Sequence, residues 1–139
     1  MEQSPYILII DDDADDRKML TDQLRHHHTD ITIQSADCGD RALTYLEDCD
    51  LDELPMLIVV DYEMPGLYGP AFLQAIRHNP RYDKIIKVVW STSAAKECAE
   101  KSMESGADKY FIKPCGLVGL EEIIGYINQI LHAWGQDVC

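Results

Sequence analysis

Acidic side chains are concentrated at the end of an apolar run near the start of the chain. Residues 6–10 are apolar, and five carboxylates follow within the next six positions: Asp11, Asp12, Asp13, Asp15 and Asp16. Carboxylates this close repel one another unless water, a helix N-terminus or a cation offsets their charge. A solvated helix start capped by aspartate accounts for the last three acids. It accounts less well for Asp11 and Asp12, which belong to the end of the apolar run, so a metal or phosphate site is an equal alternative.

Three other strand-like segments also end on side chains that could do chemistry. The residues that follow them are Asp61, Thr92 and Lys113. Carboxylate oxygens suit a hard cation such as Mg²⁺. A hydroxyl group and an ammonium group suit the oxygens of a phosphoryl group. These residue types therefore indicate phosphoryl chemistry, provided that the fold brings them together.

The candidate side chains are far apart in the sequence, so the elements between them must bring them together. Strands are expected at residues 6–10, 31–36, 56–61, 85–90 and 107–112. Apolar residues at helical spacing predict a helix after each strand, at about 14–27, 39–47, 72–76, 95–103 and 120–134. Such alternation implies an α/β fold with a parallel sheet covered on both faces. Parallel sheets bind ligands at the carboxyl ends of their strands, and neighbouring strands lie about 5 Å apart.

Composition limits the classes of protein that fit. The length of 139 residues suits one domain. The formal net charge of -13 argues against a nucleic-acid partner. No apolar stretch approaches the roughly 20 residues of a membrane span. The first ten residues lack the basic segment and cleavage pattern of a signal peptide. Five scattered cysteines favour free thiols in a reducing cytoplasm over a disulfide framework or a zinc site.

Four segments, taken in order, resemble the receiver domain of two-component response regulators. They are ILIIDD at residues 7–12, LIVVDYEMPG at 57–66, VVWSTS at 88–93 and GADKYFIKP at 106–114. Each segment alone is a weak signal, whereas all four at these spacings are specific. The resemblance implies a chemotaxis-regulator-like, single-domain receiver over residues 1–139 with a core of about 5–134. It also implies a flavodoxin-like, doubly wound sheet of five parallel strands in the order 2-1-3-4-5, with five helices.

The resemblance further implies how the acidic residues would act. Asp61 would accept the phosphoryl group. Asp12 and Asp61 would bind Mg²⁺ directly, together with the backbone carbonyl of Glu63. Asp11 would act on the metal mainly through a bound water molecule.

Three residues on the other side of the acceptor complete the implied site. Thr92 would hydrogen-bond the phosphoryl group, and Lys113 would pair with its charge. Tyr110 stands at the switch aromatic position and would turn inward as Thr92 moves toward the phosphate. The bond between Lys113 and Pro114 is expected to be cis, an isomer that X-Pro bonds adopt at little cost.

In this interpretation the protein is a signalling domain and not an enzyme, although it assists its own phosphotransfer and autodephosphorylation. The donor would be a phosphohistidine on a sensor histidine kinase or a histidine phosphotransfer protein. An output protein would dock on the face formed by the last two helices and the fifth strand.

Two alternatives stay open. Asp61-Tyr62-Glu63 superficially resembles the Asp-x-Asp pair of a Mg²⁺-dependent phosphohydrolase with an aspartyl nucleophile, and a degenerate receiver would bind partners without phosphorylation.

Overall fold

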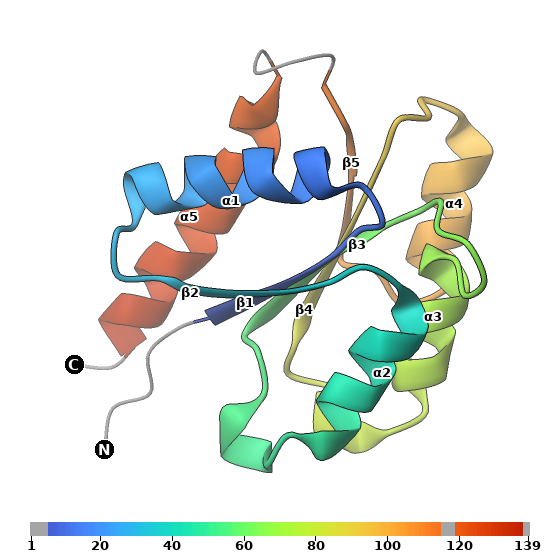
Figure 1. The fold of residues 1–139 in the computed structure, drawn as a ribbon, viewed down its shortest axis with the longest axis horizontal. Coiled ribbons are helices and arrows are strands. Elements are labelled where there is room, and N and C mark those ends of the chain that lie inside the picture. The colour runs from blue at the N-terminus through green and yellow to red at the C-terminus, as the bar shows by residue number, and fades with distance from the viewer. Residues whose placement is uncertain (1–5, 115–118, 138–139) are drawn as a thin grey trace.

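A computed structural model describes residues 6–114 and 119–137 of the chain. The strands are β1 (Tyr6–Ile10), β2 (Thr32–Ala36), β3 (Leu57–Asp61), β4 (Ile86–Ser91) and β5 (Lys109–Ile112). The α-helices are α1 (Ala14–His27), α2 (Gly39–Asp48), α3 (Gly69–Arg77), α4 (Lys96–Glu104) and α5 (Leu120–Asp137). All strand pairs are parallel and their order is β2-β1-β3-β4-β5 (Figure 1). The predicted α/β fold and its strand order are therefore confirmed.

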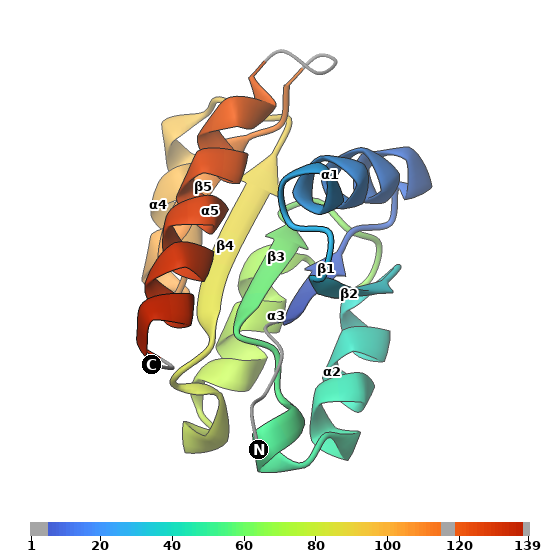
Figure 2. The ribbon, with the colours of Figure 1, turned by 90° about the vertical axis from the view of Figure 1, so that its left-hand side faces the viewer.

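Helices cover both faces of the sheet. Helices α1 and α5 lie on one face and α2, α3 and α4 on the other (Figures 1 and 2). Successive side chains of a strand point to opposite faces, so each central strand serves two cores. In β1, Ile7 and Ile9 pack toward α1 and α5, whereas Leu8 and Ile10 pack toward α2 and α3. Burial on both faces explains why these strands are continuous apolar runs in the sequence.

The same alternation directs the strand-end residues to one side of the sheet. Val59 and Trp90 belong to the core under α1 and α5, and Phe111 packs against that core. Two residues further along their strands, Asp61 and Lys113 have the same parity as Val59 and Phe111. The register pairs Asp61 with Trp90 and Trp90 with Phe111. The chain therefore brings Asp61 and Lys113 to one edge and one face, whereas Tyr110 packs against the core on the opposite face.

Some element boundaries differ from those expected from the sequence. The fifth strand begins at Lys109 and not at residue 107, because the Ala107 amide still donates to the Ser102 carbonyl at the end of α4. Two 3₁₀ helices, η1 (Leu51–Glu53) and η2 (Pro80–Tyr82), lie in segments where the sequence predicted neither a helix nor a strand. The Asp13 side chain caps α1 by accepting from the amides of Asp15 and Asp16, as expected. In α5, the side chain of Trp134 lies outside the described residues.

The Lys113–Pro114 peptide bond corrects one expectation. Within the described part of the chain no peptide bond is cis, so this bond is trans. The trans isomer is favoured by about 0.5–1 kcal/mol for X-Pro bonds. Lys113 reaches the acids from the trans backbone, with its ammonium nitrogen 2.8 Å from Asp11 Oδ2. The lysine contacts therefore do not require the cis form.

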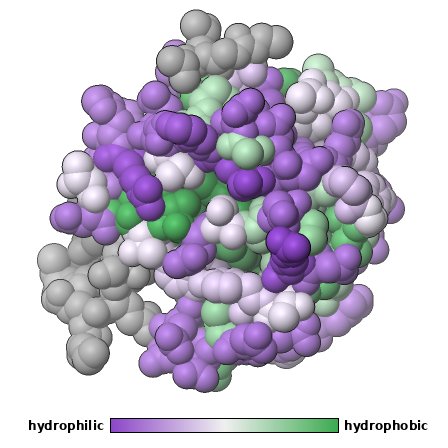
Figure 3. Space-filling view, in the orientation of Figure 1, coloured by the Kyte–Doolittle hydropathy of each residue, from purple (hydrophilic) through white to green (hydrophobic). Residues whose placement is uncertain are grey.

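One face of the molecule is mainly hydrophilic (Figure 3). Figure 3 shows polar side chains over most of the face presented in Figure 1, with small hydrophobic areas between them. Among the described residues, no helix combines the length and apolar content needed to cross a bilayer.

Candidate phosphorylation site

The carboxyl edge of the sheet holds an ammonium group surrounded by acids. The Lys113 Nζ atom lies 2.8 Å from Asp11 Oδ2, 2.9 Å from Asp16 Oδ2 and 3.3 Å from Asp61 Oδ1. The Lys113 side chain is only 7% exposed, and those of Asp11 and Asp61 are 0% and 7% exposed. A buried carboxylate is costly unless a charge of opposite sign accompanies it. Lys113 thus offsets the repulsion between the carboxylates of this site.

Three acids at this edge form a set that could hold a cation. One carboxylate oxygen from each of Asp11, Asp12 and Asp61 lies within 4.8 Å of the other two. Asp12 is exposed, whereas the other two acids are buried. Within the described residues, Asp11 Oδ2 receives no aligned hydrogen bond, although the Lys113 ammonium is close to it. An all-oxygen set with a buried oxygen that receives no aligned hydrogen bond fits a hard divalent cation.

Burial also changes the proton affinity of these groups. Burial, followed by the charge of Asp11, raises the pKa of Asp61 to about 7, although Lys113 acts in the opposite direction. The pKa of Asp11 is raised as well, mainly by burial. Burial alone would lower the pKa of Lys113, but its close contacts with Asp11 and Asp16 outweigh burial and raise it. The lysine is therefore cationic at neutral pH, and the acceptor acid gains from a further positive charge.

The remaining predicted residues surround this acidic cluster at different depths. Thr92 follows β4 and is exposed, and its hydroxyl makes no hydrogen bond to any other described residue. Tyr110 on β5 is half-buried and its hydroxyl donates to the Ser93 carbonyl at 2.7 Å. The backbone amide of Glu63 is 3.4 Å from Asp61 Oδ1, and its side chain is exposed. The functional roles of these residues stay predictions.

The Lys113 ammonium lies over the ring of Trp90. The Trp90 side chain is fully buried, and its ring centroid lies 5.0 Å from the Lys113 ammonium nitrogen. A cation at this distance over an aromatic ring is attracted by the ring quadrupole. The Trp90 indole nitrogen finds no hydrogen-bond partner among the described residues. Because the ammonium lies over this ring, we expect Trp90 fluorescence to respond to the position of Lys113.

Two contacts of the site were not anticipated from the sequence. Asp16 was assigned to the helix start, yet its carboxylate accepts a hydrogen bond from Lys113. Arg17 donates from its guanidinium to the Asp11 carbonyl at 2.6 Å and ties the first turn of α1 to the end of β1. Only the dense run of acids after β1 hinted at a role for Asp16. Helical spacing alone does not show which acid faces a lysine 97 residues away.

A glycine holds the backbone of the acceptor residue close to α3. A Cβ atom on Gly69 would lie 2.7 Å from the Asp61 carbonyl oxygen and 3.0 Å from the Tyr62 Cα. We expect Gly69→Ala to lower the free energy of unfolding by about 1–3 kcal/mol, because the backbone must shift to relieve this overlap. Gly125→Ala is the matched control. Gly125 lies exposed in α5, and a Cβ atom added there would meet nothing within 4 Å, so alanine is expected to stabilise by about 0.5–1 kcal/mol.

Urea denaturation of the two variants checks this expectation. Opposite signs of the two changes would support the close approach at Gly69. Equal changes would show that the backbone at Asp61 accommodates a methyl group and that Gly69 does not constrain the site.

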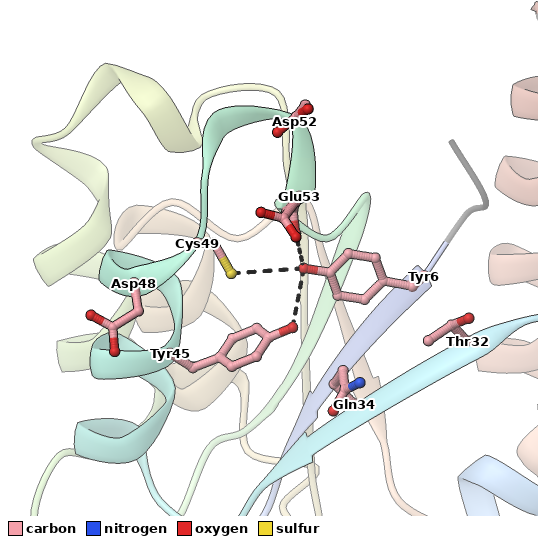
Figure 4. Close-up of a pocket in the computed structure, with 8 residues that line it drawn as sticks. All are labelled: Tyr6, Thr32, Gln34, Tyr45, Asp48, Cys49, Asp52 and Glu53. Atoms are coloured by element: carbon pink, nitrogen blue, oxygen red, sulfur yellow. Dashed lines mark hydrogen bonds between the residues drawn. The ribbon is translucent and has the colours of Figure 1, made fainter. Parts of the chain in front are cut away.

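A cavity of about 440 Å³ lies at the opposite end of β1. Figure 4 shows the Tyr6 hydroxyl at its centre, in contact with Tyr45, Cys49 and the backbone of Glu53. Its polar centre is thus satisfied within the protein and joins β1, α2 and η1. The cavity contains none of the residues of the acidic cluster, so we assign it a structural role.

Comparison with known proteins places this geometry in a family. The family model described as response regulator receiver domain matches residues 7–125. A two-component response regulator of rice (Oryza sativa subsp. japonica), ORR12, is 30% identical over 124 residues, which cover 89% of this chain and 98% of that protein.

Solved structures of similar fold support the assignment. The phosphorylated cyanobacterial phytochrome response regulator RcpA has a TM-score of 0.82 at 23% identity, over 93% of this chain and 94% of that one. The Mn²⁺-bound form of response regulator Rcp1 has a TM-score of 0.72 at 25% identity, over 88% of this chain and 91% of that one. The first of these likenesses shows the fold alone. From the family match and the rice relative, the chain belongs to the response regulator receiver domain family, whose function in two-component systems is to accept a phosphoryl group on an aspartate.

Proposed function

We propose that Asp61 is the phosphoacceptor of this receiver. The observation that carries the proposal is the convergence of Lys113 with buried Asp11 and Asp61, beside Asp12. The donor would be a phosphohistidine of a sensor histidine kinase or a histidine phosphotransfer protein. In the transfer, an Asp61 oxygen forms a bond to phosphorus and the phosphorus–nitrogen bond of the donor breaks. Two anions must meet in this step, so positive charge at the site is essential.

The chain's own residues would supply part of that charge and the orientation. The Lys113 ammonium would donate to an equatorial phosphoryl oxygen, and the Thr92 hydroxyl would donate to another. Asp11, Asp12 and Asp61, with the backbone carbonyl of Glu63, would hold Mg²⁺. A bound Mg²⁺ would supply positive charge that offsets the repulsion between the acceptor and the donor.

Signalling would follow from a shift between two conformations. We propose that Thr92 moves toward the phosphoryl group and that Tyr110 leaves the Ser93 carbonyl and turns inward. The hydrogen bond from the Tyr110 hydroxyl to the Ser93 carbonyl (2.7 Å) supports the proposal, because it is a contact that the inward turn would break. An output protein would read the change on the face of α4, β5 and α5. Differential contacts of the phosphoryl group in the two conformations would drive the shift.

We further propose that residues 1–139 form one receiver domain that works in the cytoplasm. Cys38, Cys49 and Cys98 are free thiols, which is in keeping with a reducing compartment. The protein would assist its own dephosphorylation, in which water attacks phosphorus and restores the Asp61 carboxylate.

Incubation with acetyl phosphate and Mg²⁺, followed by intact-mass measurement, tests the acceptor assignment. We expect a mass increase of one phosphoryl group that is labile to hydroxylamine and absent from Asp61→Asn. Rapid turnover of a phosphomonoester without an adduct would instead indicate a phosphohydrolase. The absence of any adduct would indicate a degenerate receiver that acts only through binding.

Glu63 is expected to influence the lifetime of the phosphorylated state. Its exposed carboxylate stands two residues after Asp61, where it would lie over the phosphoryl group and hinder the attacking water. Glu63→Ala is expected to shorten the dephosphorylation half-life by about 3-fold, a change of under about 1 kcal/mol in the barrier. The affinity for Mg²⁺ should change less, because the proposed ligand of this residue is its backbone carbonyl. Equal half-lives of the two proteins would refute this role.

A further inference from the structure

We propose that Asp16 is a positioning residue that holds the Lys113 ammonium in the unphosphorylated state and gives it up to the phosphoryl group. The inference rests on the proposed function of Asp61 and Lys113 and adds a residue to it. Asp16 thereby acts as an internal competitor of the phosphoryl group. It would set how readily the receiver enters the phosphorylated state.

The contacts of Lys113 are the first ground for this proposal. An ammonium group has three donors, and three carboxylates lie within 3.3 Å of this one. The contact with Asp16 is an aligned hydrogen bond of 2.9 Å. The acceptor Asp61 is the most distant of the three acids, at 3.3 Å. In the unphosphorylated protein, the aligned hydrogen bond that the ammonium makes among the described residues therefore goes to Asp16, away from the acceptor.

Phosphorylation would rearrange these contacts. A phosphoryl oxygen on Asp61 would draw the Lys113 ammonium toward the acceptor, in competition with its contacts to Asp11 and Asp16. The Asp11 side chain is 0% exposed, so water cannot replace the lysine there and its release is costly. Releasing Asp16 costs less, because 26% of its side chain is exposed and water can replace the lysine. Asp16 is thus the contact that Lys113 exchanges for the phosphoryl group.

The first turn of α1 fixes Asp16 in this competing position. The Asp16 amide donates to the Asp13 side chain at 3.2 Å, and the neighbouring Arg17 is bound to the Asp11 carbonyl. A carboxylate held by a capped helix loses little further freedom when it binds the lysine. Asp16 also adds a negative charge close to the incoming phosphoryl group. Both effects oppose phosphorylation, so removing the Asp16 charge should favour it.

The expected effect is on the balance between the free and phosphorylated forms. With saturating Mg²⁺, Asp16→Asn should bind beryllofluoride, a stable analogue of the phosphoryl group, about 3- to 5-fold more tightly than the wild type. This range corresponds to a partly exposed ion pair. The ratio of phosphorylated to free protein at limiting acetyl phosphate should rise by a similar factor.

Asp15→Asn is the matched control. Asp15 stands in the same turn of α1, carries the same charge and is exposed, but it makes no ion pair with Lys113 among the described residues. This variant should change beryllofluoride affinity by less than about 1.5-fold. Asp16→Glu keeps the charge and should return the affinity toward the wild-type value. Raising the salt concentration should erase a general charge effect but leave most of the difference between the Asn variants, because the Lys113 contact is largely buried.

Trp90 fluorescence distinguishes the proposed role of Asp16 from a purely structural one, because it would change only if Lys113 changes position. In a Trp134→Phe background, beryllofluoride should shift Trp90 emission as Lys113 moves over its ring. Unliganded Asp16→Asn should already show part of that shift, and Asp15→Asn none. The melting temperatures of both variants are measured in parallel.

The results separate this inference from the proposed function. Failure of the wild type to form the hydroxylamine-labile adduct on Asp61 would refute the proposed function. If the adduct forms but Asp16→Asn and Asp15→Asn bind beryllofluoride equally, the role of Asp16 is refuted. Weaker beryllofluoride binding by Asp16→Asn would also refute it, since Asp16 would then assist the lysine and not compete for it.

Discussion

Lys113→Met is expected to lower the free energy of unfolding by about 3–5 kcal/mol at pH 8 without divalent cations, because it removes the cation of a buried ion-pair cluster. Methionine preserves most of the length of the lysine side chain but not its charge. Asp11 and Asp61 would then be two buried carboxylates without a counter-charge. The buried acids would respond by binding protons, so their pKa values would rise further.

The pH and metal dependence of this loss identify its cause. Urea denaturation at pH 5 should show a much smaller loss than at pH 8, because the acids are protonated at the lower pH. Adding Mg²⁺ at pH 8 should recover part of the stability, since a divalent ion can replace the missing charge. Lys96→Met is the control. Lys96 pairs with Glu100 at an exposed site, with 86% and 55% of the side chains exposed, so its loss should change stability by less than about 0.5 kcal/mol. A Lys113 effect independent of pH would point to lost packing on Trp90.

Asp61→Asn is expected to stabilise the metal-free protein at pH 8 by about 2–4 kcal/mol, the equivalent of a pKa difference of up to about three units. The pKa of Asp61 is raised to about 7 in the fold, first by burial and then by the charge of Asp11. A raised pKa means that the folded state binds the proton more tightly than the unfolded state. The contribution of this group to stability is therefore fully present below about pH 4 and is lost as pH rises through about 7.

Thermal denaturation of both proteins in EDTA across pH 4 to 8 measures this effect. The stability difference between Asp61→Asn and the wild type should be near zero at pH 4 and should grow up to pH 8. Mg²⁺ should reduce the stability difference between the two proteins. It stabilises the ionised wild-type site, whereas in the variant it binds less well because one charged ligand is missing. A constant difference across this pH range would show that Asp61 does not titrate with a raised pKa.

Much of the fold could be predicted from the sequence. Residues 6–10 and 56–60 are continuous apolar runs because their strands are buried on both faces, and each leads directly into an acid. Carboxyl ends of parallel strands meet at one edge. Strand periodicity further directs Asp61 and Lys113 to the face of α1 and α5. The convergence of the candidate residues could therefore be predicted without coordinates.

Interactions of long side chains and isomeric states could not be predicted in this way. The trans Lys113–Pro114 bond corrects an expectation taken from family resemblance, because Lys113 reaches the acids without the cis isomer. The two 3₁₀ helices lie in segments whose turn residues also suit loops.

The sequence by itself determined which residue types stand at the strand ends, because apolar periodicity and strand parity are local properties of the chain. Only the tertiary structure decided how the single ammonium of Lys113 is shared among Asp11, Asp16 and Asp61. That distribution depends on the position of α1 over the sheet and on the burial of each carboxylate. The position of α1 and the burial of each carboxylate both result from packing between segments about 50 to 100 residues apart. Local sequence patterns carry no information on contacts at such separations.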